Sequence, residues 1–153
     1  MKKVLVFISL VALFACGSTP KNKTILTQTF DASGWERFSP VYSDMEISEP
    51  TTYDLSLKVG FTTDYSDKDF NVVFTVFDSE GTPYRAKSYS FRLKDNDGSW
   101  KSECKGGIYE FEFPINSSLS IGDPGKYRFQ LDSRMPITPL LGIHKLELIN
   151  NGK

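Results

Sequence analysis

The sequence is poor in the side chains that most catalytic and metal sites require. Its 153 residues include one histidine and two cysteines. A Ser-His-Asp triad would have to use His144, and no Gly-x-Ser-x-Gly segment is present to carry the serine. A zinc site usually takes four nitrogen or sulfur ligands, or three and a water, which His144 and Cys104 cannot supply. We therefore expect a protein without enzymatic activity, cofactor or bound metal.

The sequence also lacks an excess of positive charge and any apolar run long enough to span a membrane. Its 18 Lys and Arg residues face 19 Asp and Glu, which gives a formal net charge of −1 and a pI near 5.8. Nucleic-acid-binding proteins usually carry a basic patch or a high pI, so we expect no nucleic-acid partner. The main apolar run, Val4–Phe14, has 11 residues, whereas a transmembrane helix needs about 20.

The first sixteen residues have the features of a bacterial lipoprotein signal. Lys2 and Lys3 precede the apolar run, as in secretory signal peptides. Leu13-Phe14-Ala15-Cys16 then resembles a lipobox, in which a small residue precedes the cysteine whose sulfur receives diacylglycerol. We predict a cleaved signal peptide over residues 1–15 and lipidation of Cys16. An ordinary signal peptide that ends near a chance cysteine is the alternative.

Lipidation would hold the mature chain close to a membrane. Residues 16–23 are predicted to form a short polar tether that spans at most about 25 Å, and residues 24–153 the folded domain. Gly17 is not the aspartate that commonly retains lipoproteins in the inner membrane, and residues 18–23 contain no acid of the kind that directs surface export. We expect an outer-membrane lipoprotein that faces the periplasm. Since acylation of Cys16 leaves Cys104 alone, no intrachain disulfide can form.

Alternation of apolar and polar residues dominates the rest of the chain. The clearest stretch is Tyr53–Phe61, and such period-2 patterns predict half-buried strands. Roughly seven to nine short strands separated by turns predict one antiparallel β-sandwich, jelly-roll-like or immunoglobulin-like. A closed barrel is the alternative arrangement. The other expected strands cover residues 72–77, 89–93, 109–113, 127–131 and 143–148, with weaker patterns at 25–30 and 41–48.

Acidic and glycine-containing segments separate these strands. Asp78–Gly81, Asp95–Gly98 and Gly122–Gly125 have compositions typical of turns. The Asp95–Gly98 segment also contains the Asp-x-Asp of a calcium loop, but glycine stands where the bidentate glutamate of such a loop would be. A plain hairpin turn is therefore predicted there, and a solvated loop for the acidic cluster within residues 64–69.

The two tryptophans are the candidate recognition residues. Trp35 and Trp100 lie in loop-like contexts, whereas most other aromatic residues occupy alternating strand positions, where a core role is expected. An exposed aromatic ring can stack on a sugar. One hypothesis is therefore a glycan- or ligand-binding module with Trp35 and Trp100 on its surface. In the other interpretation each tryptophan caps one end of the sandwich.

Several short segments, taken in order, are similar to one family. Gly34-Trp35 comes first, and Asp64-Tyr65 stands ahead of an apolar strand. The most specific segment is the Leu-x-Asp-x-Asp-Gly-x-Trp turn at residues 93–100. With the lipobox, their order and spacing resemble the gliding-motility lipoproteins (GldH) of Bacteroidota. The later matching segments are Gly107, Tyr109-Glu110, Gly125–Phe129, Arg134-Met135 and Leu140–Ile143.

The resemblance covers almost the whole mature chain. It implies a non-enzymatic envelope lipoprotein of β-sandwich type with a role in gliding motility, linked to the type IX secretion apparatus. The partners it implies are the membrane, through Cys16, and other envelope or motility-machinery proteins. No catalytic residues are attributed to the family, so none carry over to this sequence.

Overall fold

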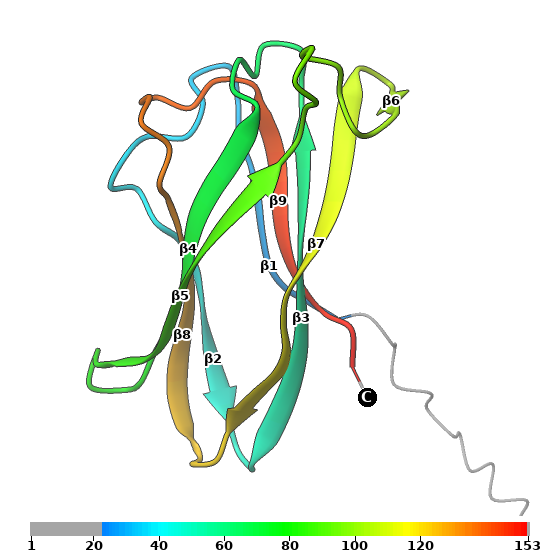
Figure 1. Cartoon of the computed structure of the whole chain (residues 1–153). Coiled ribbons are helices and arrows are strands. Elements are labelled where there is room, and N and C mark those ends of the chain that lie inside the picture. The colour runs from blue at the N-terminus through cyan, green and yellow to red at the C-terminus, as the bar shows by residue number, and fades with distance from the viewer. Residues whose placement is uncertain (1–22, 153) are drawn as a thin grey trace, which may run out of the picture.

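A computed structural model describes residues 23–152, which form two antiparallel sheets packed face to face (Figure 1). The predicted all-β sandwich is therefore confirmed, and the closed barrel is not adopted. One sheet has five strands in the order β1-β9-β3-β7-β6, and the other has four in the order β2-β8-β4-β5. The strands are β1 (Lys23–Thr29), β2 (Val41–Ile47), β3 (Thr51–Phe61), β4 (Asp69–Phe77), β5 (Pro83–Arg92), β6 (Cys104–Lys105), β7 (Ile108–Ile121), β8 (Gly125–Ser133) and β9 (Ile143–Asn150).

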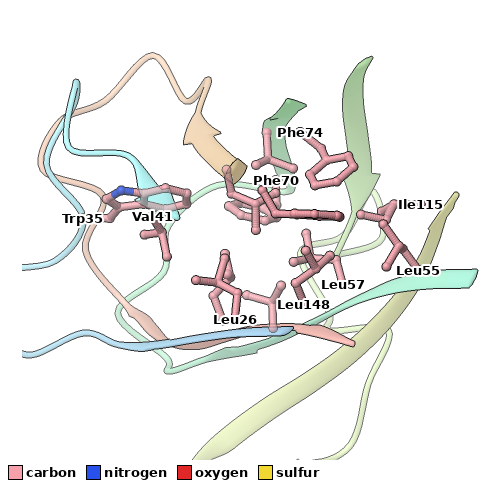
Figure 2. Packing of buried hydrophobic residues seen from close by; sticks show 14 of the residues in the cluster. Leu26, Trp35, Val41, Leu55, Leu57, Phe70, Phe74, Ile115 and Leu148 are labelled. Atoms are coloured by element: carbon pink, nitrogen blue, oxygen red, sulfur yellow. The ribbon is translucent and has the colours of Figure 1, made fainter. Parts of the chain in front are cut away.

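The core lies between the sheets and follows the alternation in the sequence. Successive side chains of a strand point to opposite faces, so Leu55, Leu57 and Phe61 of β3 all turn inward and are fully covered. Phe70 and Phe74 of β4 meet them from the other sheet (Figure 2). Burying such a side chain contributes about 1.5–3 kcal/mol. This packing stabilises the sandwich without a disulfide among the described residues.

The loops gather at the two ends of the sandwich. Residues 30–40, 62–68, 93–103 and 134–142 lie at the end drawn uppermost in Figure 1, here called the loop end. The β4–β5 hairpin and the connections before β3 and β8 lie at the opposite end. Strand β1 begins at Lys23, which pairs with Asn150, and then runs toward the loop end.

The strand boundaries differ from the predictions mainly in β5 and β7. Strand β7 has 14 residues rather than the five predicted, and its pairing with β3 is interrupted near Leu55. Strand β5 begins at Pro83, six residues before the predicted start, and most of its residues are exposed. Strand β5 ends its sheet and β7 has only β6 beyond it, so residues on both faces of these strands are partly exposed and the alternation that one-sided burial produces is weaker.

The predictions for the N-terminal region lie largely outside the described residues. The signal peptide (1–15), Cys16 and all but the last residue of the predicted tether precede Lys23, and that last residue already belongs to β1. Within residues 23–152 no helix is long and apolar enough to cross a membrane.

Candidate interaction surface

One side of the sandwich carries a row of partly exposed aromatic rings. Here β5 ends the four-stranded sheet, and β7, with only the two-residue β6 beyond it, ends the five-stranded sheet. Because neither sheet continues past this side, called the open side, the inward-facing rings of its strands remain half-buried. The aromatic row consists of Tyr89, Phe91, Phe113, Phe111, Trp100 and Tyr109.

The rings of the aromatic row stack on one another across the gap between the sheets. Phe91 of β5 lies parallel to Phe113 of β7, with centroids 4.1 Å apart and planes 9° apart. Trp100 and Tyr109 stack in the same way at 4.2 Å and 9°. Such pairs contribute about 0.5–1.5 kcal/mol beyond the area that they bury. The row therefore closes the open side, and its ring faces are largely engaged with each other.

Next to Tyr89 the open side is hollowed by a cavity of about 340 Å³. The Tyr89 hydroxyl donates a hydrogen bond to the carbonyl oxygen of Ile115 and so joins β5 to β7. The Lys87 ammonium lies 5.1 Å from the centre of the Tyr89 ring. With Arg85 and Asn116, these side chains give the cavity one aromatic wall, two cations and an amide.

The Leu-x-Asp-x-Asp-Gly-x-Trp segment is the turn that places Trp100 in the row. Its ends pair as an isolated bridge between Lys94 and Trp100. The Asp97 carboxylate accepts hydrogen bonds from the backbone N–H and hydroxyl of Ser99, at 2.9 and 2.6 Å. Asp95 forms an ion pair with Lys101 at 3.1 Å. Both carboxylates thus bond to protein groups and stabilise a hairpin turn, as predicted.

Lys94 is buried within this turn, with 9% of its surface exposed. Its ammonium donates a 2.6 Å hydrogen bond to the carbonyl oxygen of Tyr65 and lies 4.3 Å from the centre of the Trp100 ring. Burial disfavours the charged form and lowers the pKa of Lys94, while nearby Asp67 acts in the opposite direction. The buried ammonium thereby links the 62–68 loop to the Trp100 turn.

Trp100 is half-buried, between the two interpretations made from the sequence. One face of its indole stacks on Tyr109, and its ring also approaches Phe61 of the core, with centroids 6.2 Å apart. Trp100 therefore caps the core at the loop end and still presents part of its ring to solvent.

Trp35 lies in the core, which agrees with the interpretation that it caps one end of the sandwich and not with the hypothesis of a surface recognition role. It is 3% exposed, and its ring packs on Phe30 with centroids 5.4 Å apart. Its indole N–H donates a 2.7 Å hydrogen bond to the carbonyl oxygen of Ser39. Figure 2 shows it at the end of the core where Val41 lies. The sequence context resembled an exposed loop because the segment that covers Trp35, around Leu140, is about 100 residues away.

Two glycines hold the loops of the loop end together. Gly34 has φ +78°, and a Cβ there would lie 2.5 Å from the Leu140 carbonyl oxygen. Gly142 has φ +77°, and a Cβ there would lie 2.1 Å from the backbone nitrogen of Tyr65. Both positions need glycine for conformation and for close approach. These contacts explain why the Gly-Trp and Leu-x-Gly-Ile segments belong to one structural unit.

The chemical groups considered for catalysis are not brought together. Cys104 lies on β6 and His144 on β9, and strands β7 and β3 separate them in the sheet. Three strand spacings amount to about 14 Å, which excludes a hydrogen-bonded thiol–imidazole pair. The acidic loop is also engaged, because Asp67 accepts hydrogen bonds from the backbone N–H groups of Lys68 and Asp69.

Three exposed apolar side chains at the loop end were missed from the sequence. Phe38 is 90% exposed, Ile137 56% and Leu141 49%. Phe38 is also the one non-glycine residue among those described that has a positive φ, +63°. The sequence shows these residues only as single apolar residues within predicted loops, and such residues are too common to indicate a function.

Comparison with known families identifies the chain. The model of one family, described as GldH lipoprotein, matches residues 25–148. The chain belongs to the GldH lipoprotein family. Membership in GldH confirms the resemblance drawn from the sequence motifs and assigns the protein to the lipoproteins of the cell envelope. The match spans seven of the nine strands completely and most of β1 and β9.

Comparisons of this GldH-family chain with curated proteins and solved structures give weaker similarities. No curated protein matches it. A protein from Sulfurospirillum deleyianum is 13% identical with a TM-score of 0.40, over 86% of this chain and 98% of that one. A CBM4 structure is 11% identical with a TM-score of 0.36, over 83% and 67%. A family 35 carbohydrate binding module from Clostridium thermocellum is 12% identical with a TM-score of 0.34, over 83% and 90%.

Proposed function

We propose that this protein is a non-enzymatic, lipid-anchored component of the gliding-motility apparatus that acts through protein–protein contacts. The observation that carries the proposal is the GldH family match over residues 25–148, which includes nearly all of the described domain. Through those contacts the protein would connect to type IX secretion. Its direct contacts would be other envelope or motility-machinery proteins.

The anchor is part of the same proposal. Signal peptidase would remove residues 1–15, Cys16 would carry the acyl chains, and two or more acyl chains make membrane attachment stable. The tether would then hold the domain within about 25 Å of the outer membrane, on its periplasmic face. Membership in a lipoprotein family supports this assignment.

Deletion in the native host tests the motility role. Loss of spreading motility and of type IX secretion is expected, and both should return with the wild-type chain supplied in trans. A deletion strain that glides and secretes normally would overturn the proposal. Cys16→Ala tests the anchor separately: the protein should leave the membrane fraction, and unchanged partitioning into detergent would contradict lipidation.

A second candidate function is binding of an envelope glycan or another ligand on the open side. The observation that favours it is the 340 Å³ cavity beside Tyr89, in which an aromatic ring stands next to the cations Arg85 and Lys87. Aromatic rings stack on sugar faces, and the cations suit an acidic sugar. Trp100, at the other end of the aromatic row, would extend the surface.

Calorimetric titration with solubilised peptidoglycan fragments and an acidic polysaccharide tests this second function. Binding that weakens at least tenfold in Lys87→Ala and persists in Lys126→Ala, a control lysine on another face, is the expected result. The absence of heat with both probes, or equal affinity in both variants, would reject it.

A further inference from the structure

Three large apolar side chains are exposed on two loops of the loop end that are far apart in the sequence. Phe38 belongs to the β1–β2 loop, and Ile137 and Leu141 belong to the β8–β9 loop. We call these three side chains the apical cluster. They account for three of the five large apolar residues that are exposed within residues 23–152. Single exposed apolar residues are ordinary, so the case for a contact surface depends on how the two loops are held together and on what surrounds Phe38.

The two loops form one rigid platform beneath the apical cluster. Trp35 and Leu140 exchange backbone hydrogen bonds of 3.1 and 2.9 Å. The backbone N–H of Arg37 donates to the Thr138 hydroxyl at 2.9 Å, and the Arg37 guanidinium donates to the Pro136 carbonyl oxygen at 2.6 Å. Trp35 and Leu140 are themselves buried. The surface is therefore preformed, which reduces the entropy that a partner must overcome on binding.

Phe38 contributes little to the stability of the fold. Its ring is 90% exposed, so it buries almost no area, and its φ of +63° is unfavourable for a residue with a bulky side chain. Glycine or asparagine would fit this backbone with less strain. A strained, exposed aromatic residue on a rigid platform is typical of a residue kept for recognition.

The charges beside the ring define the chemistry of the partner. Phe38 borders a hollow of about 470 Å³ together with Arg37, Arg134 and Pro136. Neither guanidinium forms an ion pair with another residue of the described segment. The one carboxylate lining the hollow, that of Asp132, accepts a hydrogen bond from Gln130 at 2.9 Å. The hollow thus offers an apolar ring beside two guanidinium groups and one carboxylate, so its formal net charge is +1 and favours an anionic group.

We propose that the apical cluster and this hollow bind a protein segment in which an apolar side chain stands beside a carboxylate. The proposal rests on the proposed function, because it supplies the docking surface that contact with the motility machinery requires. A membrane is a less suitable occupant. Lys23 lies level with Leu55 in the middle of β3, and β1 advances about 20 Å from there toward the loop end. The cluster therefore lies away from the residue that the proposed anchor would precede.

Photocrosslinking in the native host tests the partner. The full-length protein with p-benzoylphenylalanine at position 38 should form an adduct with one protein, and mass spectrometry should place the crosslink within a few residues of Asp or Glu. The same adduct should form from position 137. It should fall at least fivefold with Arg134→Glu, and it should not form from Tyr42, an exposed aromatic position on β2. Adducts only with lipid or with a second copy, no adduct, or an adduct indifferent to Arg134→Glu would overturn the proposal.

A stability measurement separates recognition from a structural role. Phe38→Gly should unfold at the same or a higher urea concentration than wild type, while the adduct obtained from position 137 falls at least fivefold. Earlier unfolding would make Phe38 a structural residue and would overturn the inference. The motility role is tested independently by the deletion strain. If the deletion strain loses motility but Phe38→Gly does not reduce the adduct from position 137, the proposed function stands and this surface is rejected.

Discussion

The aromatic row on the open side and the apical cluster at the loop end both place apolar side chains near the surface, but they differ in how far other side chains cover them. In the row, each ring is half-buried and stacks on a neighbour, as Phe91 does on Phe113. In the cluster, Phe38 is 90% exposed, and no aromatic neighbour of its ring is found among the described residues. Aromatic content therefore does not by itself mark a recognition site. What distinguishes the two regions is whether the fold already covers the ring faces.

The same contrast separates stabilising residues from those available for binding. Loss of a ring from the aromatic row should reduce stability, because other rings depend on it for packing. Loss of the Phe38 ring should leave the fold intact. Four sets of variants test this difference, and they follow in order of decreasing change in stability.

Gly142→Ala should have the largest effect, because it removes the support beneath the loop end. The added Cβ would lie 2.1 Å from the Tyr65 nitrogen at a φ of +77°, so the free energy of unfolding should fall by about 3 kcal/mol or more. Gly81→Ala is a matched control: φ is +79°, nothing lies near the new Cβ, and the expected loss is about 1 kcal/mol. Equal losses in urea denaturation would contradict the close contact.

Trp100→Ala should lower the free energy of unfolding by about 2–3 kcal/mol, since it uncovers Tyr109 and Phe61. Tyr42→Ala removes an aromatic ring that is 48% exposed and should change stability by about 0.5 kcal/mol or less. Chemical denaturation of both variants checks the difference. If Trp100→Ala were as mild as the control, the aromatic row would be a surface feature rather than part of the core.

Lys94→Met should lower the free energy of unfolding near neutral pH by about 1 kcal/mol, through loss of the hydrogen bond to Tyr65. The pKa of Lys94 is lowered below its ordinary value of 10.5 in the folded protein. Between the lowered pKa and 10.5, the unfolded chain therefore binds more protons at this residue than the folded protein does. Wild-type stability should therefore rise with pH in that interval, relative to the variant. The raised pKa of Tyr65 acts in the opposite direction above pH 10, but it is common to both proteins. Parallel pH profiles of the two proteins would show that Lys94 is not desolvated.

Phe38→Gly should have the smallest effect and the opposite sign. Relief of the positive φ is worth about 1–2 kcal/mol and exceeds the extra unfolded-state entropy of glycine, about 0.5–1 kcal/mol, so the free energy of unfolding should rise by about 0.5 kcal/mol. Phe38→Ala keeps the Cβ and the strain and should leave stability nearly unchanged. Denaturation in urea measures both variants, and a clear loss in each would place Phe38 among the stabilising residues.

Much of the fold was predictable, because alternation records which face of a strand is buried. Tyr53–Phe61 became the inner face of β3, and the weaker patterns at residues 25–30 and 41–48 became β1 and β2. The turn at Asp95–Gly98 was also correct, since its side chains bond within the turn itself. Strands β5 and β7 were less well predicted, because the open side exposes residues on both faces of a strand.

The candidate surfaces were less predictable, because they depend on contacts between distant segments. Trp35 and Phe38 are three residues apart in one loop, yet Trp35 is buried and Phe38 is almost fully exposed. Lys94 has the sequence context of an ordinary loop residue, but the 62–68 loop and Trp100 enclose it. Local composition contains no information about which segment will pack on a loop.

The positions of most strands, the turns, the family and the expectation of a lipidated cysteine follow from the sequence, because each is recorded in neighbouring residues or in short motifs. The tertiary structure decided which aromatic rings are covered and which are presented. That decision depends on strand order, which brings residues 31–40 against residues 134–142 and β5 against β7. Whether a side chain on a loop or at the end of a sheet is exposed depends on the segments that pack against it, and these segments are distant in the sequence.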